Sequence, residues 1–173
     1  MKITKIYLDM DGVLCDFEKR YIQLYNEYPK AARKRKLFSE NWHDFVKTNQ
    51  FEKLDYFPGA LRLMKYVNSL DIPVEILSSS GGKTYHSEVE RQKIKWLKDH
   101  NIRYKPNIVD GRRAKAQYAT PSTILIDDTP EVIKFFDYAF AKGDKEALAL
   151  DYVPLPEKVK STIRAEWRRL GFL

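Results

Sequence analysis

Residues 6–14 read IYLDMDGVL, a short apolar run followed directly by two aspartates that are separated by one residue. The run is typical of a buried β-strand, and in open parallel sheets ligands bind where the strands reach their carboxyl ends. Two carboxylates on a turn at that point can share one divalent cation, while Gly12 lets the chain turn away sharply. The simpler interpretation is that Asp9 and Asp11 only form hydrogen bonds within the turn. The stretch therefore predicts a parallel sheet with an acidic loop after its first strand.

The pattern of a strand followed by a helix recurs along the chain. Further apolar, β-branched runs occur at residues 74–77, 107–109 and 123–126, with a weaker run at 147–150. Stretches with helical spacing lie between them, around residues 59–70, 86–99 and 130–141. Strands that alternate with helices form βαβ units and a parallel sheet that is buried on both faces. We therefore expect an α/β fold with a Rossmann-like parallel sheet.

The segment 18–56 interrupts this alternation with helical patterns alone. A first helix is predicted from five residues that share one helical face: Phe17, Tyr21, Leu24, Tyr25 and Tyr28. Pro29 is expected to end this helix. A basic run from Lys30 to Lys36 follows. Ser39 is then expected to N-cap a second helix, whose apolar face is Trp42, Phe45 and Val46. We therefore predict a small helical cap, residues 18–56, inserted into a core that is formed by residues 1–17 and 57–173.

The composition indicates a packed globular chain of one domain, or of one domain with a small insertion. Of its 173 residues, 43% are hydrophobic and 13% are aromatic, which is the opposite of a disordered composition. The single cysteine, Cys15, excludes an internal disulfide and a cage of thiolate metal ligands. No stretch approaches the roughly 18 apolar residues of a membrane span, so a soluble, cytoplasmic protein is expected. The formal net charge of +7 favours anionic partners, such as nucleic acid, nucleotides or small phosphate esters.

Polar groups follow two more of the predicted strands. Residues 78–82 read SSSGG, where hydroxyl and backbone N–H groups can hold phosphate oxygens, although the stretch also fits an ordinary loop. Asp127 and Asp128 follow the strand at 123–126; they too fit a turn, but buried acids are costly unless a cation holds them. Lys115, twelve residues before Asp127, is on its own typical of a surface lysine. Together these strand ends carry the nucleophile, hydroxyl and acid that phosphoryl transfer requires.

With these motifs the chain resembles the haloacid dehalogenase superfamily over about residues 1–130. The superfamily signature is a DxDG nucleophile loop, a later Ser/Thr strand end, a lysine and an acidic pair. Within it the chain is similar to the 5'(3')-deoxyribonucleotidases and their phage-type relatives, through DMDGVLCDF at 9–17, FPGA at 57–60 and IDD at 126–128. It departs from the mammalian-type enzymes in SGGK at 80–83 and in a longer spacing from Lys115 to Asp127. Both loops touch substrate in the family, so the resemblance specifies the chemistry better than the substrate.

The resemblance implies a magnesium-dependent phosphomonoesterase that acts through an aspartyl-phosphate, and most specifically a 5'-nucleotidase for (deoxy)nucleoside monophosphates. Asp9 would be the nucleophile, and Asp11 would protonate the leaving group and then activate water. The Asp9 side chain, the Asp11 carbonyl and Asp128 would hold Mg²⁺, with Asp127 orienting water or Lys115.

Other residues would contact the substrate. Ser78, Ser79, the nearby backbone and Lys115 would stabilise charge on the transferring phosphoryl oxygens. Phe17 and Trp42 are the candidates for an aromatic pocket that stacks the base, as in nucleotidases of this kind. Both rings fit equally well as packing between the cap and the core.

Two other functions remain open from the sequence. An end-phosphatase of DNA or RNA would use Lys30–Lys36 and a basic C-terminal helix as a track for the nucleic-acid backbone. That helix, after Pro156, places Val159, Ile163, Trp167 and Leu170 at helical spacing, which favours a surface helix packed on a core. The second alternative is a catalytically idle module of the same fold that binds nucleic acid. Such a module would not need the intact set of Asp9, Asp11, Ser78, Lys115 and Asp128, which argues against it. The sequence leaves base preference, sugar preference and oligomeric state undetermined.

Overall fold

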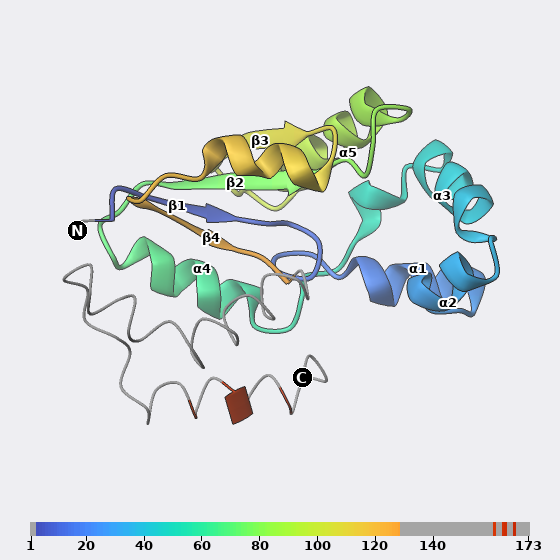
Figure 1. Cartoon of the computed structure of the whole chain (residues 1–173), viewed down its shortest axis with the longest axis horizontal. Coiled ribbons are helices and arrows are strands. Elements are labelled where there is room, and N and C mark those ends of the chain that lie inside the picture. The colour runs from blue at the N-terminus through green and yellow to red at the C-terminus, as the bar shows by residue number, and fades with distance from the viewer. Residues whose placement is uncertain (1–2, 129–160, 162–163, 166–167, 169–173) are drawn as a thin grey trace. The chain divides into compact units, whose positions relative to one another are not determined.

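Four parallel strands form the centre of the fold, in the order β3-β2-β1-β4 (Figure 1). The computed structural model describes residues 3–128, 161, 164–165 and 168. The strands are β1 (Lys5–Leu8), β2 (Val74–Ser79), β3 (Lys105–Val109) and β4 (Thr123–Ile126). The expected α/β fold and these four strands are thereby confirmed. The weak run at 147–150 and the predicted helix at 130–141 lie outside the described residues.

The strand order places a topological switch point beside β1. The chain runs outward from β1 to β2 and β3, and then returns to the other side of β1 to form β4. Leu8 pairs with Ile126 in the last register position of β1 and β4, so both strands end at the same level. Ligands of open α/β sheets bind in the crevice at such a point. The two acidic loops therefore leave the sheet side by side.

Alternate strand residues face two packing layers. The larger cluster contains Ile6, Leu8 and Ile76 together with residues of α4 (Ala60–Asn68) and α5 (His86–Asp99), which cover one face of the sheet. The smaller cluster contains Tyr7, Leu77 and Val109 with Ala114 and Tyr118 of the 3₁₀ helix η2 (Arg112–Tyr118). The alternation follows from the two-residue period of a β-strand. The sheet is thus packed on both faces, as its continuous apolar strands predict.

The segment between β1 and α4 is helical, but it differs in detail from the prediction. It contains α1 (Phe17–Tyr25), α2 (Pro29–Lys34), α3 (Phe38–Lys47) and the 3₁₀ helix η1 (Gln50–Lys53). Pro29 begins α2 instead of ending the first helix, which ends at the left-handed Asn26. A proline at the first helical position is favoured because its missing N–H has no intrahelical acceptor there. The basic run is therefore itself largely helical.

Ser39 was expected to cap the second helix, and this prediction is wrong. The helix α3 begins two residues earlier, at Phe38, and Leu37 occupies the N-cap position without a side-chain hydrogen bond. The Phe38 ring stacks on Tyr21 with 5.8 Å between centroids, so packing has overridden the capping preference. The expected apolar face holds, because Phe45 and Val46 are buried.

Buried hydrogen bonds tie the helical segment to α5. The Gln92 side chain accepts from the Phe51 N–H at 3.3 Å and donates to the Val46 carbonyl at 2.8 Å. The Trp96 Nε1–H donates to the Leu54 carbonyl at 2.8 Å.

The chain divides into two compact units, Met1–Asp127 and Asp128–Leu173, and the helical segment belongs to the first. The predicted boundaries of a separate cap stay a prediction.

Little of the C-terminal stretch is described. Ser161, Arg164, Ala165 and Arg168 are helical, in agreement with the predicted helix, whereas its apolar positions lie outside the described residues. Within the part of the chain that the structure describes, no helix is long and apolar enough to cross a membrane.

Candidate active site

Asp9 lies immediately after β1 and is nearly buried, with 6% of its surface exposed. Its backbone N–H donates to the Ile126 carbonyl at 2.9 Å, which extends the pairing with β4 by one residue. Its carboxylate accepts from the Met10 N–H at 2.7 Å through Oδ1 and from Lys115 Nζ at 2.7 Å through Oδ2. The carboxylate is therefore held in one orientation at the end of the strand.

Lys115 joins the two acidic loops. Its Nζ lies 2.7 Å from Asp9 Oδ2 and 2.7 Å from Asp127 Oδ2. Only 8% of Lys115, which lies in η2, is exposed, so it is not the surface lysine that an isolated lysine in a sequence suggests. A buried ammonium requires anionic partners, and these two carboxylates supply them. The loops after β1 and β4 thus meet at one edge of the sheet, as the proposed chemistry requires.

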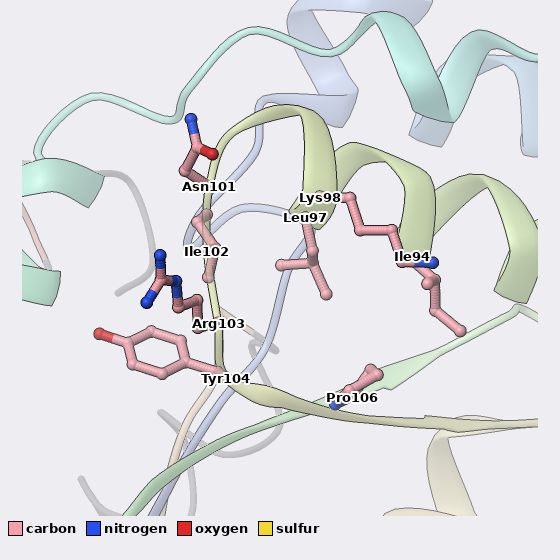
Figure 2. Close-up of a pocket in the computed structure, with 8 residues that line it drawn as sticks. All are labelled: Ile94, Leu97, Lys98, Asn101, Ile102, Arg103, Tyr104 and Pro106. Carbon is pink, nitrogen blue, oxygen red and sulfur yellow. The ribbon is translucent and has the colours of Figure 1, made fainter.

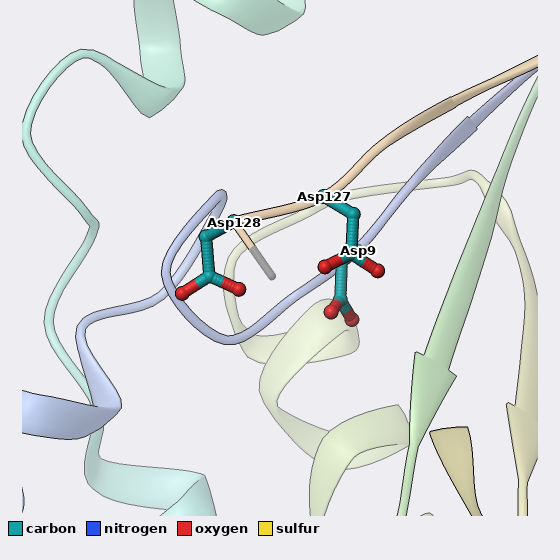
Figure 3. A group of neighbouring side chains, drawn as sticks. All are labelled: Asp9, Asp127 and Asp128. Carbon is teal, nitrogen blue, oxygen red and sulfur yellow. The ribbon is translucent and has the colours of Figure 1, made fainter. Parts of the chain in front are cut away.

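Three carboxylates form a group that fits a hard cation (Figure 3). Oxygen atoms of Asp9, Asp127 and Asp128 all lie within 4.8 Å of one another. Oxygen ligands suit Mg²⁺, a hard cation that completes its octahedral shell with water. The Asp11 side chain is not in this group, and its predicted contribution was the backbone carbonyl. The residues present fit the metal that the sequence predicts.

The Asp11 carboxylate is held by a lysine that the sequence reasoning missed. Lys93 of α5 places its Nζ 2.7 Å from Asp11 Oδ2, and only 1% of this lysine is exposed. The other Asp11 oxygen accepts from Cys15 Sγ at 3.6 Å. The signal was present in the helical spacing, because Lys93 occupies the apolar stripe formed by Val89 and Leu97. A lysine within such a stripe indicates a buried ion pair.

The two serines at the end of β2 have different surroundings. Ser78 is fully buried, and its Oγ accepts a hydrogen bond from Lys93 Nζ at 2.9 Å. The Ser79 carbonyl also accepts from Lys93, whereas its Oγ accepts from the Gly81 N–H at 3.0 Å and closes the following turn. Both serines therefore lie at the edge that carries Asp9 and Asp11. Their predicted contact with phosphoryl oxygens stays a prediction.

Trp42 lies against the loop that follows these serines. Gly81 has φ = +82°, and a Cβ at this position would lie 2.8 Å from Cζ2 of the Trp42 ring. Only glycine combines this backbone conformation with such a close approach. The indole of α3 thus contacts the loop after β2.

Phe17 is part of an aromatic cluster within the helical segment. Its ring lies 5.1 Å from Phe45, 5.9 Å from Phe51 and 6.0 Å from Trp42, measured between centroids. Phe17 and Trp42 are both partly buried against the core. These contacts show that both rings pack within the protein, which is one of the two roles that the sequence allowed. Base stacking by either ring stays a prediction.

Burial and charge shift the protonation equilibria at this edge. Burial raises the pKa of the Asp9 carboxyl, against the lowering effect of the Lys115 and Lys93 ammonium groups. Burial lowers the pKa of Lys93, but the Asp11 and Asp9 carboxylates more than offset it, so the pKa is raised and the lysine stays charged. Burial also raises the pKa of the Cys15 thiol well above its usual value, so this cysteine stays protonated.

A separate pocket of about 360 Å³ lies between the end of α5 and the start of β3 (Figure 2). Its described lining residues are Ile94, Leu97, Lys98, Asn101, Ile102, Arg103, Tyr104 and Pro106. They include no carboxylate, and they come from α5, the turn that follows it and the start of β3, whereas Asp9 follows β1. The pocket is therefore not the place where the acidic residues can act.

Comparison with known proteins gives a match over most of the chain. The model of a family described as "5' nucleotidase, deoxy (Pyrimidine), cytosolic type C protein" matches residues 2–140. Shorter matches occur to the phosphate-binding protein PstS of Haemophilus influenzae, 48% identical over 42 residues, and of Pasteurella multocida, 52% identical over 40 residues. They cover 24% and 23% of this chain but only 13% and 12% of those relatives' lengths. A haloacid dehalogenase-like hydrolase of Burkholderia xenovorans aligns over 82% of this chain and 80% of its own, with 12% identity and a TM-score of 0.45.

Proposed function

Since the chain belongs to the 5' nucleotidase, deoxy (Pyrimidine), cytosolic type C family, we propose that it releases phosphate from (deoxy)nucleoside monophosphates through a phosphorylated Asp9. Family membership supports a phosphoric monoester hydrolase over an idle binding module. The nucleotide substrate and a cytoplasmic location, which the family description suggests, are parts of the proposal, and so is the magnesium requirement, which the acidic group supports. The observation that carries it is the joining of Asp9 to Asp127 by Lys115 at the end of β1.

The covalent step uses Asp9 as the nucleophile. An oxygen of its carboxylate attacks phosphorus, the bond from phosphorus to the ester oxygen breaks, and an aspartyl-phosphate forms. The departing alkoxide takes a proton from Asp11 and leaves as the nucleoside. Asp11, now a carboxylate, takes a proton from water as that water attacks the aspartyl-phosphate and releases inorganic phosphate. The side chain of Asp11 is 31% exposed, which suits a group that exchanges protons with substrate and water.

The charges of the site support a divalent cation. The carboxylates of Asp9, Asp127 and Asp128 accompany two ammonium groups, Lys93 and Lys115, so the named groups carry one excess negative charge while Asp11 holds its proton and two once Asp11 has given it up. One Mg²⁺, held by Asp9, Asp127 and Asp128 with the Asp11 carbonyl, would offset this negative charge. When bound, the ion supplies positive charge against the repulsion between an anionic nucleophile and an anionic phosphate.

Binding of the substrate is assigned to the remaining predicted residues. Lys115, the Ser78 hydroxyl and the backbone near Ser79 would stabilise charge that develops on the phosphoryl oxygens. Phe17 and Trp42 would stack on the base from the side of the helical segment. The end-phosphatase alternative would instead use the exposed cations of α2, and oligonucleotide substrates distinguish the two.

The test compares phosphate release from dTMP and dUMP with release from 3'- and 5'-phosphorylated oligonucleotides, in Mg²⁺ and in EDTA. We expect turnover of the mononucleotides that requires Mg²⁺ and that Asp9→Asn reduces by at least about 10³-fold. Asp55→Asn is the control, because Asp55 is exposed and pairs only with Lys19 among its described salt bridges. Wild-type activity in Asp9→Asn would remove the covalent mechanism. Faster turnover of oligonucleotides would replace the substrate assignment.

A further inference from the structure

We propose that Lys93 is a positioning residue that holds Asp11 in the orientation from which it protonates the leaving group. The inference rests on the proposed function and adds a residue that the predicted site does not contain. Lys93 lies on α5, in the layer that covers the sheet, whereas Asp11 lies in the loop after β1. A direct ion pair of 2.7 Å joins them across 82 residues of sequence.

The hydrogen-bond inventory of Lys93 supports positioning instead of substrate contact. An ammonium group has three N–H donors and no acceptor. Three protein oxygens lie within hydrogen-bond distance of Nζ: Asp11 Oδ2 at 2.7 Å, Ser78 Oγ at 2.9 Å and the Ser79 carbonyl at 2.9 Å. With all three donors engaged and the residue 1% exposed, Lys93 acts on the reaction through its partners.

These partners connect two separate strand ends. Ser78 and Ser79 are the last two residues of β2, which is paired with β1 on the side away from β4. Lys93 therefore fixes the Asp11 carboxylate relative to the rigid end of a central strand. Its Nζ also lies 5.2 Å from the centre of the Phe51 ring, so the lysine contacts the helical segment as well. A carboxylate on a glycine-containing turn gains a defined direction from this anchor.

The hydrogen bond between Lys93 and Ser78 also restricts the orientation of the Ser78 hydroxyl. Because Lys93 can only donate, Ser78 Oγ is the acceptor of their hydrogen bond. The serine proton therefore points away from Nζ, so Lys93 restricts the orientation of this hydroxyl. Each of the two groups, the Asp11 carboxylate and the Ser78 hydroxyl, loses a hydrogen-bond partner when the ammonium is removed.

A purely structural ion pair would behave differently from a positioning residue. A loss of general-acid geometry slows departure of a poor leaving group, such as the alkoxide of a nucleoside. It hardly affects p-nitrophenolate, which leaves without a proton. A loss of packing or of folded protein lowers turnover of both substrates by the same factor. The ratio of the two effects therefore separates the roles.

The experiment measures kcat and KM of Lys93→Met and Lys93→Arg with dUMP and with p-nitrophenyl phosphate. Arginine keeps the buried charge, and its planar fork does not reproduce three tetrahedral donors, so it provides the test if the methionine variant does not fold. We expect kcat on dUMP to fall about 10²-fold or more and kcat on p-nitrophenyl phosphate to fall less than about tenfold. Lys95→Met is the matched control, since Lys95 lies on the same helix and is half-exposed. It should leave both rates unchanged.

A double-mutant cycle with Asp11→Asn completes the test. If Lys93 acts through Asp11, the double variant loses no more activity on dUMP than Asp11→Asn alone. Equal losses on the two substrates, or losses that multiply in the double variant, would overturn the inference while leaving the proposed function intact. A wild-type protein that releases phosphate from neither substrate would overturn both.

Discussion

Replacing Lys115 by methionine should destabilise the metal-free protein much more than the magnesium-loaded one. The lysine Nζ lies 2.7 Å from both Asp9 Oδ2 and Asp127 Oδ2, and these side chains are no more than 9% exposed. Methionine has a similar length but no charge. The substitution therefore leaves two neighbouring, nearly buried carboxylates without the cation that joins them.

The magnitude follows from the burial of the group. Removing one partner of a buried ion pair costs about 3–5 kcal/mol of unfolding free energy. For a chain of 173 residues this corresponds to a fall in melting temperature of about 6–20 °C. Mg²⁺ held by Asp9, Asp127 and Asp128 would supply positive charge to the same carboxylates, so much of the loss should be recovered in magnesium. Turnover should still fall by about 10²–10³-fold, because a group that stabilises the transferring phosphoryl is missing.

Thermal melts in EDTA and in excess Mg²⁺, followed by circular dichroism, measure both effects. Lys19→Met is the control, because Lys19 forms an exposed ion pair with Asp55 and its loss should move the melting temperature by less than about 3 °C. A Lys115→Met protein as stable as wild type in EDTA would refute the electrostatic reasoning. Equal stabilisation of both proteins by Mg²⁺ would refute the placement of the cation at these carboxylates.

Two further predictions concern the surroundings of the site. Gly81→Ala should lower the melting temperature by about 2–8 °C, because the residue has φ = +82° and its Cβ would lie 2.8 Å from Trp42 Cζ2. Gly111→Ala is the control and should change the melting temperature little, because a Cβ at Gly111 meets no atom within 4 Å. Equal effects of the two substitutions would contradict the argument. Glu75→Gln should lower the melting temperature at pH 7 by about 1–3 °C. The hydrogen bond from Lys5 lowers the Glu75 pKa, so its contribution is present above the unfolded-state pKa of about 4.3 and is lost as pH falls through the folded-state pKa. Melts from pH 7 to pH 3 should show the difference shrinking in acid, and a constant difference would count against the shift.

The strands and the location of the site follow from local sequence. Runs such as Thr123–Ile126 are short, apolar and bounded by polar residues, so the strand and its end coincide with the pattern. Because parallel strands end at one edge, the meeting of Asp9 with Asp127 follows once the strands are assigned. The pattern therefore carried the information on both the fold and the position of the acids.

What the sequence concealed depends on tertiary contacts. The helical spacing of Lys93 with Val89 and Leu97 indicates that the lysine is buried, but this spacing does not identify the carboxylate that pairs with it. That partner, Asp11, lies 82 residues away. The start of α3 at Phe38, without the expected Ser39 cap, reflects the stacking of Phe38 on Tyr21, which local propensity does not contain. These differences arise where long-range packing decides between local alternatives.

The strand order also determines when the nucleophile acquires its surroundings during synthesis. β1 is made first, yet it lies inside the sheet, and its neighbour β4 follows 118 residues later, from Lys5 to Thr123. At about 5–20 residues per second, a ribosome needs roughly 6–24 s to cover this distance. During that interval one edge of β1 has no strand beside it, and Asp9 lacks both Lys115 and Asp127. The acidic cluster can therefore assemble only after all four strands of the described sheet have been made.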